Sequence, residues 1–220
     1  MSTQPNFDPI ARPYQFLEYL TLGPTLQRCR THHLPALLQQ KSALVLGDGD
    51  GRFLAQLLAS NPEIRVDAID TSRTMLDLLE ARCKAASPTA AARLTTHQAD
   101  ARLFVRNLGP EKQYDLVVTH FFLDCLTQPE LEALIQAITP HLAPNALWLL
   151  SDFRVPARGV TRSLARALVR SLYLAFRLIT GLRTIQLPDY ATALIAANLA
   201  PIAVRHRLSG MLTTELWQFK

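Results

Sequence analysis

The sequence predicts an α/β protein built on one doubly wound, mostly parallel, seven-stranded sheet that ends in an antiparallel hairpin. Three observations support this prediction. Short apolar runs rich in β-branched residues alternate with helical patterns. A glycine-rich turn follows the first of these runs, and a turn sequence separates the last two. Strands that alternate with helices of this length form βαβ units, whose strands pair in parallel.

The expected strands are short apolar runs bounded by polar or turn-forming residues. They are Ala43–Leu46, Arg65–Ile69, Arg93–His97, Tyr114–Thr119, Ala146–Leu150, Ile202–Leu208 and Leu212–Phe219. Only the turn signal Ser209–Gly210 separates the last two, which is why they are expected to form a hairpin.

The expected helices combine an apolar face with signals at their first turn. They are Arg52–Ser60, Ser72–Lys84, Glu130–His141 and Asp189–Ala197. Ser72 stands at an N-cap position, and Pro129 precedes the third helix. Two further helical segments lie outside the alternation: an N-terminal cap at residues 9–40 and an inserted helix at residues 160–182.

Composition limits the classes to which the protein can belong. The chain has 220 residues, of which 49% are apolar and 19% charged, as expected for a single globular domain at residues 1–220. The net charge of +5 includes no dense basic cluster, so we expect no nucleic-acid partner. Cys29, Cys83 and Cys125 are far apart and predict free thiols, and we expect no metal site. Because the stretch 1–8 lacks an apolar signal core, we expect a cytoplasmic protein.

A glycine loop, Gly47-Asp48-Gly49-Asp50-Gly51, lies between the first strand and the first helix. Glycines at alternate positions permit a sharp turn and let a ligand lie against the backbone, near the positive end of a helix. Dinucleotide-binding loops carry the pattern G-x-G-x-x-G, but here Arg52 occupies the place of the third glycine, which comes one residue early at Gly51. The P-loop pattern is absent too, because no Gly-Lys-Ser/Thr follows. The loop therefore fits a ligand-binding turn but neither the dinucleotide pattern nor the P-loop pattern.

The segments "LVLGDGDGRF", "VDAIDTSRTML", "HQADAR" and "YDLVVTHFFLD" together resemble the class I S-adenosylmethionine-dependent methyltransferase family, in order and in spacing. The resemblance covers roughly residues 40–152. It implies S-adenosylmethionine as the cofactor and a Rossmann-like fold.

The resemblance also implies which residues hold the cofactor. The loop would bind its methionine end, an acid after the second strand its ribose, and an acid after the third strand its adenine. The residues are Gly47, Asp48, Gly49, Gly51, Asp70, Thr71, Asp100, Ala101 and His120. A carboxylate at Asp70 can accept both ribose hydroxyls, and its alternative role is to serve the helix at Ser72. The alternative role of Asp100 is to cap a short helix.

His120 and Asp124 are the predicted catalytic residues, at the carboxyl end of the fourth strand. His-Phe-Phe-Leu stands where amino-methylating relatives carry Asn-Pro-Pro-Tyr, which argues against a base or an amide as acceptor. A histidine can take a proton from a hydroxyl or phenol, or it can be a hydrogen-bonded strand-end residue. Asp124 either orients His120 or caps the next turn, and Asp152 and Arg154 are expected to form structural ion pairs.

One departure from the family is Val45, which occupies the place of an acid that usually contacts the methionine ammonium group. Asp48 or Asp50 would then compensate, or the cofactor would bind less tightly. The resemblance as a whole implies methyl transfer to a small molecule, and we expect an apolar acceptor that is quinone-like, phenolic or a lipid. Three alternatives stay open: transfer of another group from the same cofactor, non-catalytic cofactor binding, and an NAD(P)-dependent oxidoreductase.

The inserted helix at 160–182 is expected to cover the acceptor pocket. Arg158, Arg162, Arg166 and Arg170 recur every four residues beside an apolar face. Basic helices of this kind lie on anionic membrane surfaces, so peripheral membrane contact is a further prediction, against the alternative of a helix packed on the domain. The oligomeric state is left open.

Overall fold

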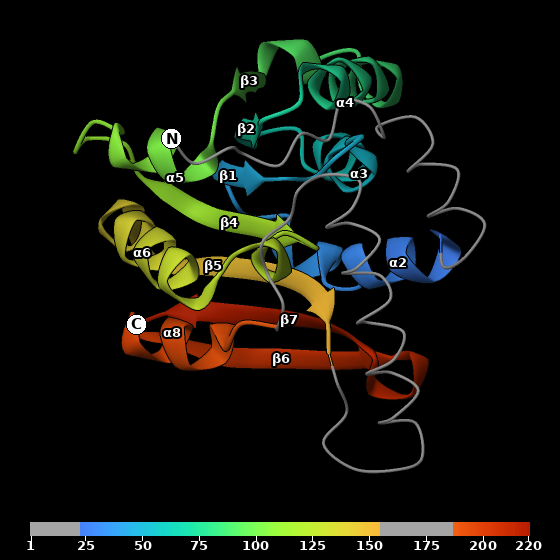
Figure 1. Ribbon diagram of the computed structural model, residues 1–220. Coiled ribbons are helices and arrows are strands. Elements are labelled where there is room, and N and C mark those ends of the chain that lie inside the picture. Colours follow the sequence, from blue (N-terminus) through green and yellow to red (C-terminus); the bar gives the residue numbers. More distant parts are fainter. Residues whose placement is uncertain (1–22, 155–186) are drawn as a thin grey trace.

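The computed structural model describes residues 23–154 and 187–220, through which one seven-stranded mixed sheet runs (Figure 1). The strand order is β3-β2-β1-β4-β5-β7-β6. Strands β1 to β5 run parallel, whereas β7 is antiparallel to both β5 and β6. The strands are β1 (Ser42–Leu46), β2 (Arg65–Asp70), β3 (Leu94–Gln98), β4 (Tyr114–His120), β5 (Leu142–Phe153), β6 (Leu199–Arg207) and β7 (Leu212–Phe219). The predicted fold class is confirmed.

Helices cover both faces of this sheet. Helices α2, α3 and α4 lie on one face, and α5, α6 and α8 lie on the other (Figure 1). Their bounds are α2 (Gly23–Arg30), α3 (Arg52–Ser60), α4 (Arg73–Ala86), α5 (Ala101–Arg106), α6 (Gln128–Ile138) and α8 (Tyr190–Ala196). Because β1 pairs with β2 on one side and β4 on the other, the strand order reverses at β1. Ligands of doubly wound sheets bind at the carboxyl ends of the strands beside such a point.

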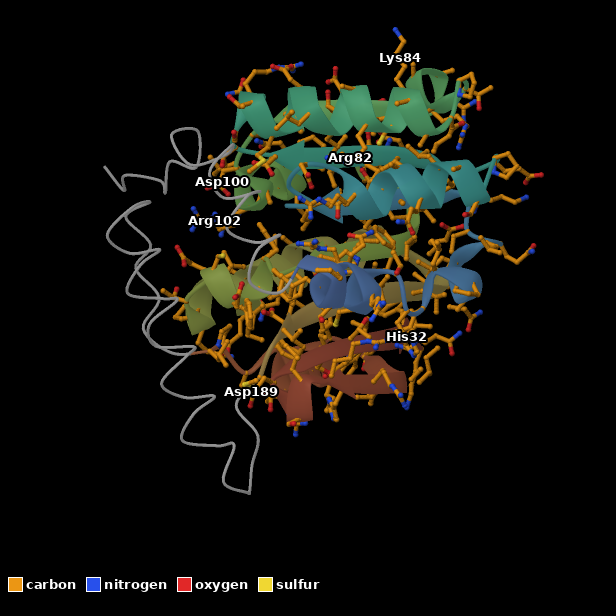
Figure 2. All side chains as sticks on the ribbon, turned by 90° about the vertical axis from the view of Figure 1, so that its right-hand side faces the viewer. His32, Arg82, Lys84, Asp100, Arg102 and Asp189 are labelled. Carbon is orange, nitrogen blue, oxygen red and sulfur yellow. The ribbon has the colours of Figure 1, made fainter. Side chains whose placement is uncertain are left out.

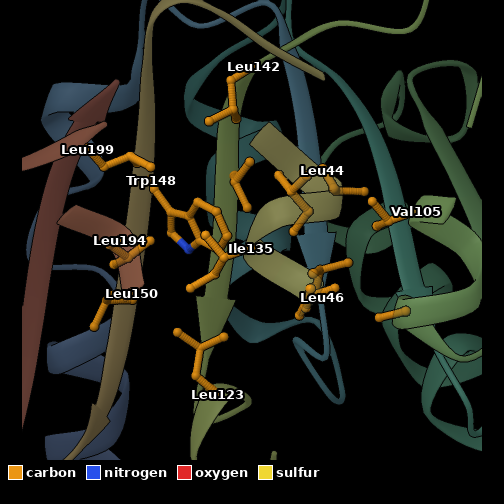
Figure 3. Close-up of a cluster of buried hydrophobic side chains, with 14 of the residues drawn as sticks. Leu44, Leu46, Val105, Leu123, Ile135, Leu142, Trp148, Leu150, Leu194 and Leu199 are labelled. Carbon is orange, nitrogen blue, oxygen red and sulfur yellow. The ribbon is translucent and has the colours of Figure 1, made fainter. Parts of the chain in front are cut away.

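The hydrophobic core forms two layers because successive residues of a strand point to opposite faces. Leu44 and Leu46 pack with α5, α6 and α8, whereas Val45 packs with α3 and α4. Trp148 lies in the first layer, among leucines of several strands (Figure 3). Its indole N–H donates to Thr119 Oγ1 at 3.0 Å, so this large side chain is buried without an unpaired donor.

The predicted elements agree with the structure except at some ends. The predicted helix Arg52–Ser60 has the bounds of α3, and Ser72 caps α4 by accepting the Met75 N–H at 3.2 Å. The helix predicted to reach His141 ends at Ile138 and is followed by a 3-10 turn. Strand β5 is longer than predicted because β7 pairs with it as far as Phe153.

Other elements were not predicted or lie outside the description. Helix α5 was missed because its six residues are too few to show an apolar period. Helix α2 and the 3-10 turn Leu34–Leu37 form part of the expected N-terminal cap. The remainder of that cap, residues 9–22, and the predicted helix at 160–182 lie outside the described residues.

A polar cluster around Asp67 joins the neighbouring parts of β2, β3 and β4. Asp67 accepts hydrogen bonds from the Tyr114 hydroxyl at 2.9 Å and from Lys112 Nζ at 2.8 Å, and His97 Nε2 lies 3.0 Å away. Burial acts to raise the pKa of Asp67, but the bonds from Lys112, His97 and Tyr114 outweigh burial and hold the pKa below its ordinary value. The cluster therefore favours the charged carboxylate in the folded protein.

Asp67→Asn is expected to lower the free energy of unfolding at neutral pH by about 1–3 kcal/mol, because charge-assisted hydrogen bonds are lost. A carboxylate with a depressed folded pKa stabilises the native state above its unfolded pKa. This stability is lost as the pH falls through the folded pKa. Urea denaturation of wild type and variant should therefore converge below about pH 3. A difference that is unchanged at acid pH would contradict this assignment.

Candidate functional site

The glycine loop turns sharply at the carboxyl end of β1. Gly47, Gly49 and Gly51 have φ values of +66°, +61° and +77°, in the left-handed region that only glycine adopts without strain. The Gly47 N–H donates to the Ile69 carbonyl of β2 at 3.0 Å. The loop is thereby tied to the neighbouring strand and leads directly into the N-terminus of α3.

The three glycines differ in what a side chain would meet. A Cβ at Gly47 would lie 2.6 Å from Phe122 Cδ2, and a Cβ at Gly51 would lie 2.8 Å from Leu79 Cα. At Gly49, no atom of the described residues lies within 4 Å of such a Cβ. Gly47 and Gly51 are therefore needed for packing, whereas Gly49 leaves its backbone open to a ligand.

The two loop acids hold the shape of the loop. Asp48 is buried, and its Oδ2 accepts the Leu54 N–H of α3 at 3.0 Å. Asp50 Oδ2 accepts from Arg52 Nε at 2.9 Å and from Arg82 Nη2 of α4 at 2.8 Å. Val45, which replaces the usual acid, is buried in the core. If Asp48 or Asp50 makes the ligand contact that the missing acid at position 45 would have made, it does so with a carboxylate that already holds the loop in shape.

Asp70 ends β2 at the same edge of the sheet as the glycine loop. Its Oδ1 accepts the Ser72 N–H at 2.9 Å, and the side chain is half-buried. The predicted helix-capping role is therefore present, on one carboxylate oxygen. Thr71 follows in a half-exposed position at the same edge. Both residues therefore lie at the edge of the sheet where the glycine loop turns.

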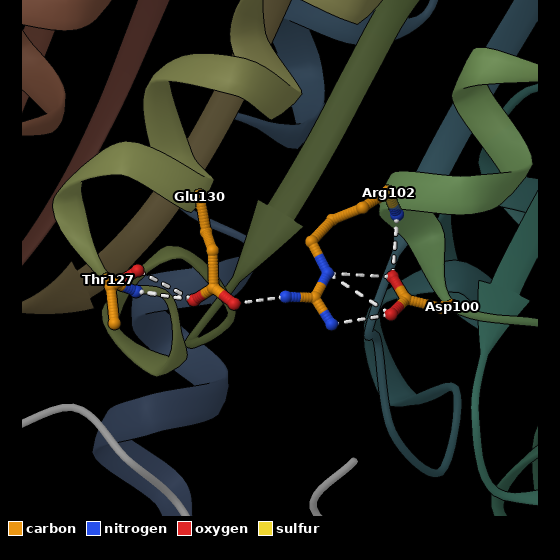
Figure 4. Close-up of polar contacts among 4 residues, drawn as sticks. All are labelled: Asp100, Arg102, Thr127 and Glu130. Carbon is orange, nitrogen blue, oxygen red and sulfur yellow. Dashed lines mark hydrogen bonds and ion pairs between the residues drawn. The ribbon is translucent and has the colours of Figure 1, made fainter. Parts of the chain in front are cut away.

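Asp100 is the N-cap of α5 and belongs to a network that reaches α6 (Figure 4). Its Oδ1 accepts the Arg102 N–H at 2.8 Å, and its Oδ2 accepts from Arg102 Nη2 at 2.5 Å. The same guanidinium bonds to Glu130, which forms a capping box with Thr127. Figure 2 shows Asp100 and Arg102 side by side at the surface.

This network sets the charge of Asp100. Burial acts to raise the pKa of Asp100, and the hydrogen bonds and charge of Arg102 lower it by more, so that the pKa lies below its ordinary value. Asp100 is thus an anion that both caps α5 and faces Arg102. Ala101 beside it is buried, and Ala99 is half-buried against the core.

His120 is buried at the end of β4 with 2% of its surface exposed. Neither ring nitrogen has a hydrogen-bond partner among the described residues. The imidazole packs edge-to-face on Phe53 of α3 at a centroid distance of 4.6 Å. Burial and the positive charge of Arg30 lower its pKa well below the ordinary value, so the ring is neutral. The alternative prediction of a hydrogen-bonded strand-end histidine is wrong within the described residues.

The segment after His120 connects β4 to the glycine loop and to β5. Phe121 has a φ of +53°, a strained value for a bulky residue, and its N–H donates to the Ser151 carbonyl at 2.7 Å. The next ring, Phe122, lies against Gly47. Backbone strain of this kind concentrates at functional sites, because the surroundings must hold it in place.

Asp124 and Asp152 lie together beyond this segment, and both are buried. Asp152 Oδ2 accepts the Asp124 N–H at 3.2 Å, and Oδ1 accepts the Phe153 N–H at 2.8 Å. Burial and the nearby Asp124 charge raise the pKa of Asp152 well above its ordinary value. Among the described residues, the Asp124 carboxylate accepts no hydrogen bond from either His120 nitrogen, so the predicted orienting role is not fulfilled in this structure.

The predicted ion pairs of Asp152 and Arg154 are also corrected. Within residues 23–154 and 187–220, Asp152 forms no salt bridge, and Arg154 Nη1 instead lies 2.9 Å from His206 Nε2. Sequence reasoning also missed Phe53 and Arg30 beside His120. No local signal could have found them, because both come from other helices and are brought to His120 by packing.

Two further properties concern the described residues only. No group of three or more His, Cys, Asp or Glu side chains among them is arranged to hold a metal ion. None of the helices in this part of the chain combines the length and the apolar composition needed to cross a membrane.

Comparisons with known proteins agree with this geometry. Residues 44–148 match the model of a family described as a methyltransferase domain. A malonyl-[acyl-carrier protein] O-methyltransferase from Halalkalibacterium halodurans is 30% identical over 137 residues, which cover 58% of this chain and 48% of that protein. The chain thus spans about half the length of this curated relative.

Solved structures show the same fold. An O-methyltransferase family protein from Burkholderia thailandensis superposes with a TM-score of 0.72 at 17% identity, over 96% of this chain and 59% of that chain. The N-methyltransferase NodS from Bradyrhizobium japonicum, in complex with S-adenosyl-L-homocysteine, gives a TM-score of 0.62 at 16% identity, over 88% and 87% of the two chains.

The strand order reverses at β1, a glycine loop follows β1, and β7 is antiparallel to its neighbours. These features define the Rossmann-like methyltransferase class of fold. The matched methyltransferase domain at residues 44–148, the curated relative and the shared fold together support the class I S-adenosylmethionine-dependent methyltransferase family for this chain.

Proposed function

We propose that this chain is an S-adenosylmethionine-dependent methyltransferase acting on a small, apolar acceptor. One observation carries the proposal: a glycine loop with an open Gly49 backbone, the Asp70 carboxylate and the buried His120, which has no hydrogen-bond partner in residues 23–154 and 187–220, all stand at the carboxyl ends of adjacent strands. A ligand laid against the loop would reach the acid on one side and the imidazole on the other.

The chain's residues fit this cofactor. The open backbone at Gly49 is a cradle that any side chain would fill, and the loop leads into the N-terminus of α3. Gly47, Asp48, Gly49 and Gly51 would form the loop contacts. Asp70 with Thr71 would hold the ribose hydroxyls, and Asp100 with Ala101 the adenine edge. Bound there, the cofactor supplies a sulfonium methyl group for an in-line displacement.

His120 would act on the acceptor side. A neutral imidazole has a free lone pair, which can accept the proton that a hydroxyl or phenol loses as its oxygen is methylated. The Phe53 ring packs on the imidazole, and the Phe122 ring lies against Gly47 of the loop. Such walls favour an apolar acceptor, such as a quinone-like, phenolic or lipid molecule, and exclude water from the proton transfer. Asp124, which is buried beyond the same segment, would complete the acceptor end.

The relatives support oxygen as the methylated atom, because one is named as an O-methyltransferase of malonyl-[acyl-carrier protein] and another belongs to an O-methyltransferase family. We place the protein in the cytoplasm, with membrane contact through residues 160–182 and no nucleic-acid partner, on the sequence evidence alone. The role of that segment as a cover of the acceptor pocket has the same basis.

A second candidate is non-catalytic cofactor binding, which the replacement of the usual acid by the buried Val45 favours. Incubation with methyl-labelled cofactor and a cell extract separates the two. A catalyst transfers the label to an extractable product, whereas a sensor leaves it on the cofactor. A product without added methyl mass would indicate transfer of another group.

Asp70→Ala is expected to weaken S-adenosylmethionine binding about tenfold to hundredfold, because hydrogen bonds to a charged carboxylate are lost. Calorimetric titration of the cofactor measures this directly. Asp77→Ala removes an exposed acid of α4 and is the matched control, with unchanged affinity expected. Equal affinities of wild type and Asp70→Ala would overturn the ribose assignment, and titration with NADH tests the nicotinamide alternative.

A further inference from the structure

The outer edge of the sheet is formed by β6, which pairs only with β7 among the described strands (Figure 1). Edge strands are normally protected, and this one carries both charged and apolar exposed side chains. Ile202 and Val204 of β6 are 52% and 49% exposed, and Ile195 of the neighbouring α8 is 60% exposed. These three are the majority of the large exposed apolar side chains in the described residues, which otherwise include Leu38 and Leu103.

Positive charge gathers on the same edge. Arg205 is exposed, Arg207 is half-buried, and neither forms an ion pair with a carboxylate of the described residues. Burial and the charges of Arg207 and Arg205 lower the pKa of His32, which lies beside them after α2. Between Asp189 and Glu215 the sequence contains no acidic residue. The positive charge of the edge is therefore not neutralised by an acid of β6 itself.

We propose that the outer edge of β6, with Arg205, Arg207, Ile202, Val204 and the adjacent Ile195, binds the anionic headgroup layer of a membrane. We call these five residues the β6 edge. This inference extends the membrane contact of the proposed function to a part of the fold that its sequence argument does not include. The proposed cofactor site lies at β1, β2 and β3, which β4, β5 and β7 separate from β6. Membrane binding by the β6 edge therefore does not depend on cofactor binding.

The mixture of side chains favours lipid over nucleic acid. Successive residues of β6 point to opposite faces, so Val204 and Arg205 flank the strand edge from its two sides. A membrane that meets this edge can contact both, and at the boundary between headgroups and acyl chains apolar burial and charge attraction add. Single-stranded nucleic acids are instead held by aromatic stacking. Tyr190, the aromatic residue of α8, is half-buried, and its hydroxyl donates to Glu215 at 2.8 Å, while β6 has no aromatic residue.

Continuity of the chain also points to a membrane. Arg154 follows β5 at this edge, where its N–H donates to the Met211 carbonyl at 2.8 Å and its guanidinium meets His206 of β6. In the sequence, Arg154 stands four residues before Arg158, the first arginine of the basic stripe predicted at 158–170. The charge of the β6 edge thus adjoins the point where that basic sequence begins.

Co-sedimentation with vesicles tests the proposal on the full chain at low salt. Wild type is expected to bind vesicles of phosphatidylcholine with phosphatidylglycerol, and not phosphatidylcholine alone. Arg205→Gln with Arg207→Gln should weaken this binding about 30-fold, because each arginine near an anionic surface contributes about a factor of five to six. Arg65→Gln with Arg106→Gln makes the same charge change on β2 and α5, and should weaken it less than about threefold.

Three further arms make the outcome decisive. Arg205→Lys with Arg207→Lys keeps the charge and should retain binding, even if the glutamine variant is unstable. Ile202→Thr with Val204→Thr should also weaken it. The proposal is overturned if wild type does not bind, if the glutamine variant equals its control, or if wild type prefers duplex DNA to the vesicles. Cofactor titration of the same variants should show unchanged affinity, so a failed membrane contact is distinguished from a failed enzyme assignment.

Discussion

His120→Phe is expected to reduce kcat by about 10²- to 10⁴-fold while leaving cofactor affinity nearly unchanged, because the ring loses its proton-accepting nitrogen. The same variant should raise the melting temperature by a few degrees. Both ring nitrogens are buried without a partner in the described part of the chain, and removing unsatisfied polar groups stabilises a protein by about 1–3 kcal/mol. Activity and stability therefore change in opposite directions, as expected when a residue is kept for function.

The pH dependence gives this prediction a second measurement. The pKa of His120 is lower in the folded protein than in the unfolded chain, so below about pH 6.5 only the unfolded state takes up the proton. Wild-type stability is therefore lost as the pH falls, and the stability gained by His120→Phe should grow between about pH 7.5 and 5.5.

His141→Phe is the matched control for both measurements. His141 is also buried, but its Nδ1 lies 2.9 Å from the Lys112 carbonyl. It directly precedes β5, at the end of the sheet away from the glycine loop. Its replacement should destabilise the protein and leave kcat unchanged. If His120→Phe keeps full activity, or if it is destabilised like His141→Phe, then His120 has a structural role.

Gly51→Ala is expected to lower the free energy of unfolding by about 2–5 kcal/mol. A left-handed backbone costs a residue with a Cβ about 1–2 kcal/mol, and overpacking adds about 1–3 kcal/mol. Both costs apply because φ is +77° and the new Cβ would lie 2.8 Å from the Leu79 Cα, a backbone atom of α4 that cannot rotate away. Thermal or urea denaturation without cofactor measures the loss.

Gly49→Ala separates strain from packing. Its φ is +61°, but no described atom lies within 4 Å of the new Cβ, so only the strain of about 1–2 kcal/mol is expected. Cofactor affinity should nevertheless fall in this variant, because the methyl group occupies the space left for the ligand. Equal destabilisation of the two variants would contradict the packing argument, and full affinity in Gly49→Ala would contradict the ligand placement.

Much of the cofactor side was predictable from sequence because it depends on strand ends. Residues that directly follow parallel strands meet at one edge of the sheet, whatever the details of packing. The loop at Gly47–Gly51 and the acids Asp70 and Asp100 follow β1, β2 and β3 in this way. Their roles toward a ligand stay predictions, while their places at the edge are confirmed.

The acceptor side was less predictable because its chemistry depends on burial. The sequence indicated a histidine at the end of β4, but the same histidine could have been hydrogen-bonded. Its contact with Phe53 and the nearby charge of Arg30 come from α3 and α2. Asp152 was expected in an ion pair and is instead buried beside Asp124, since η4 (Leu123–Cys125) folds back over the end of β5.

The sequence by itself determined the strands, most of the helices and the glycine loop. These features depend on the spacing of apolar residues and on backbone conformations that single residue types prefer, both of which are local. The tertiary structure alone decided that His120 is buried and neutral, that Asp50 is held by Arg82, and that Asp152 favours its protonated form. Protonation and pairing depend on the solvent excluded and the charges brought near by distant segments, and these are set only when the whole sheet and its helices have packed.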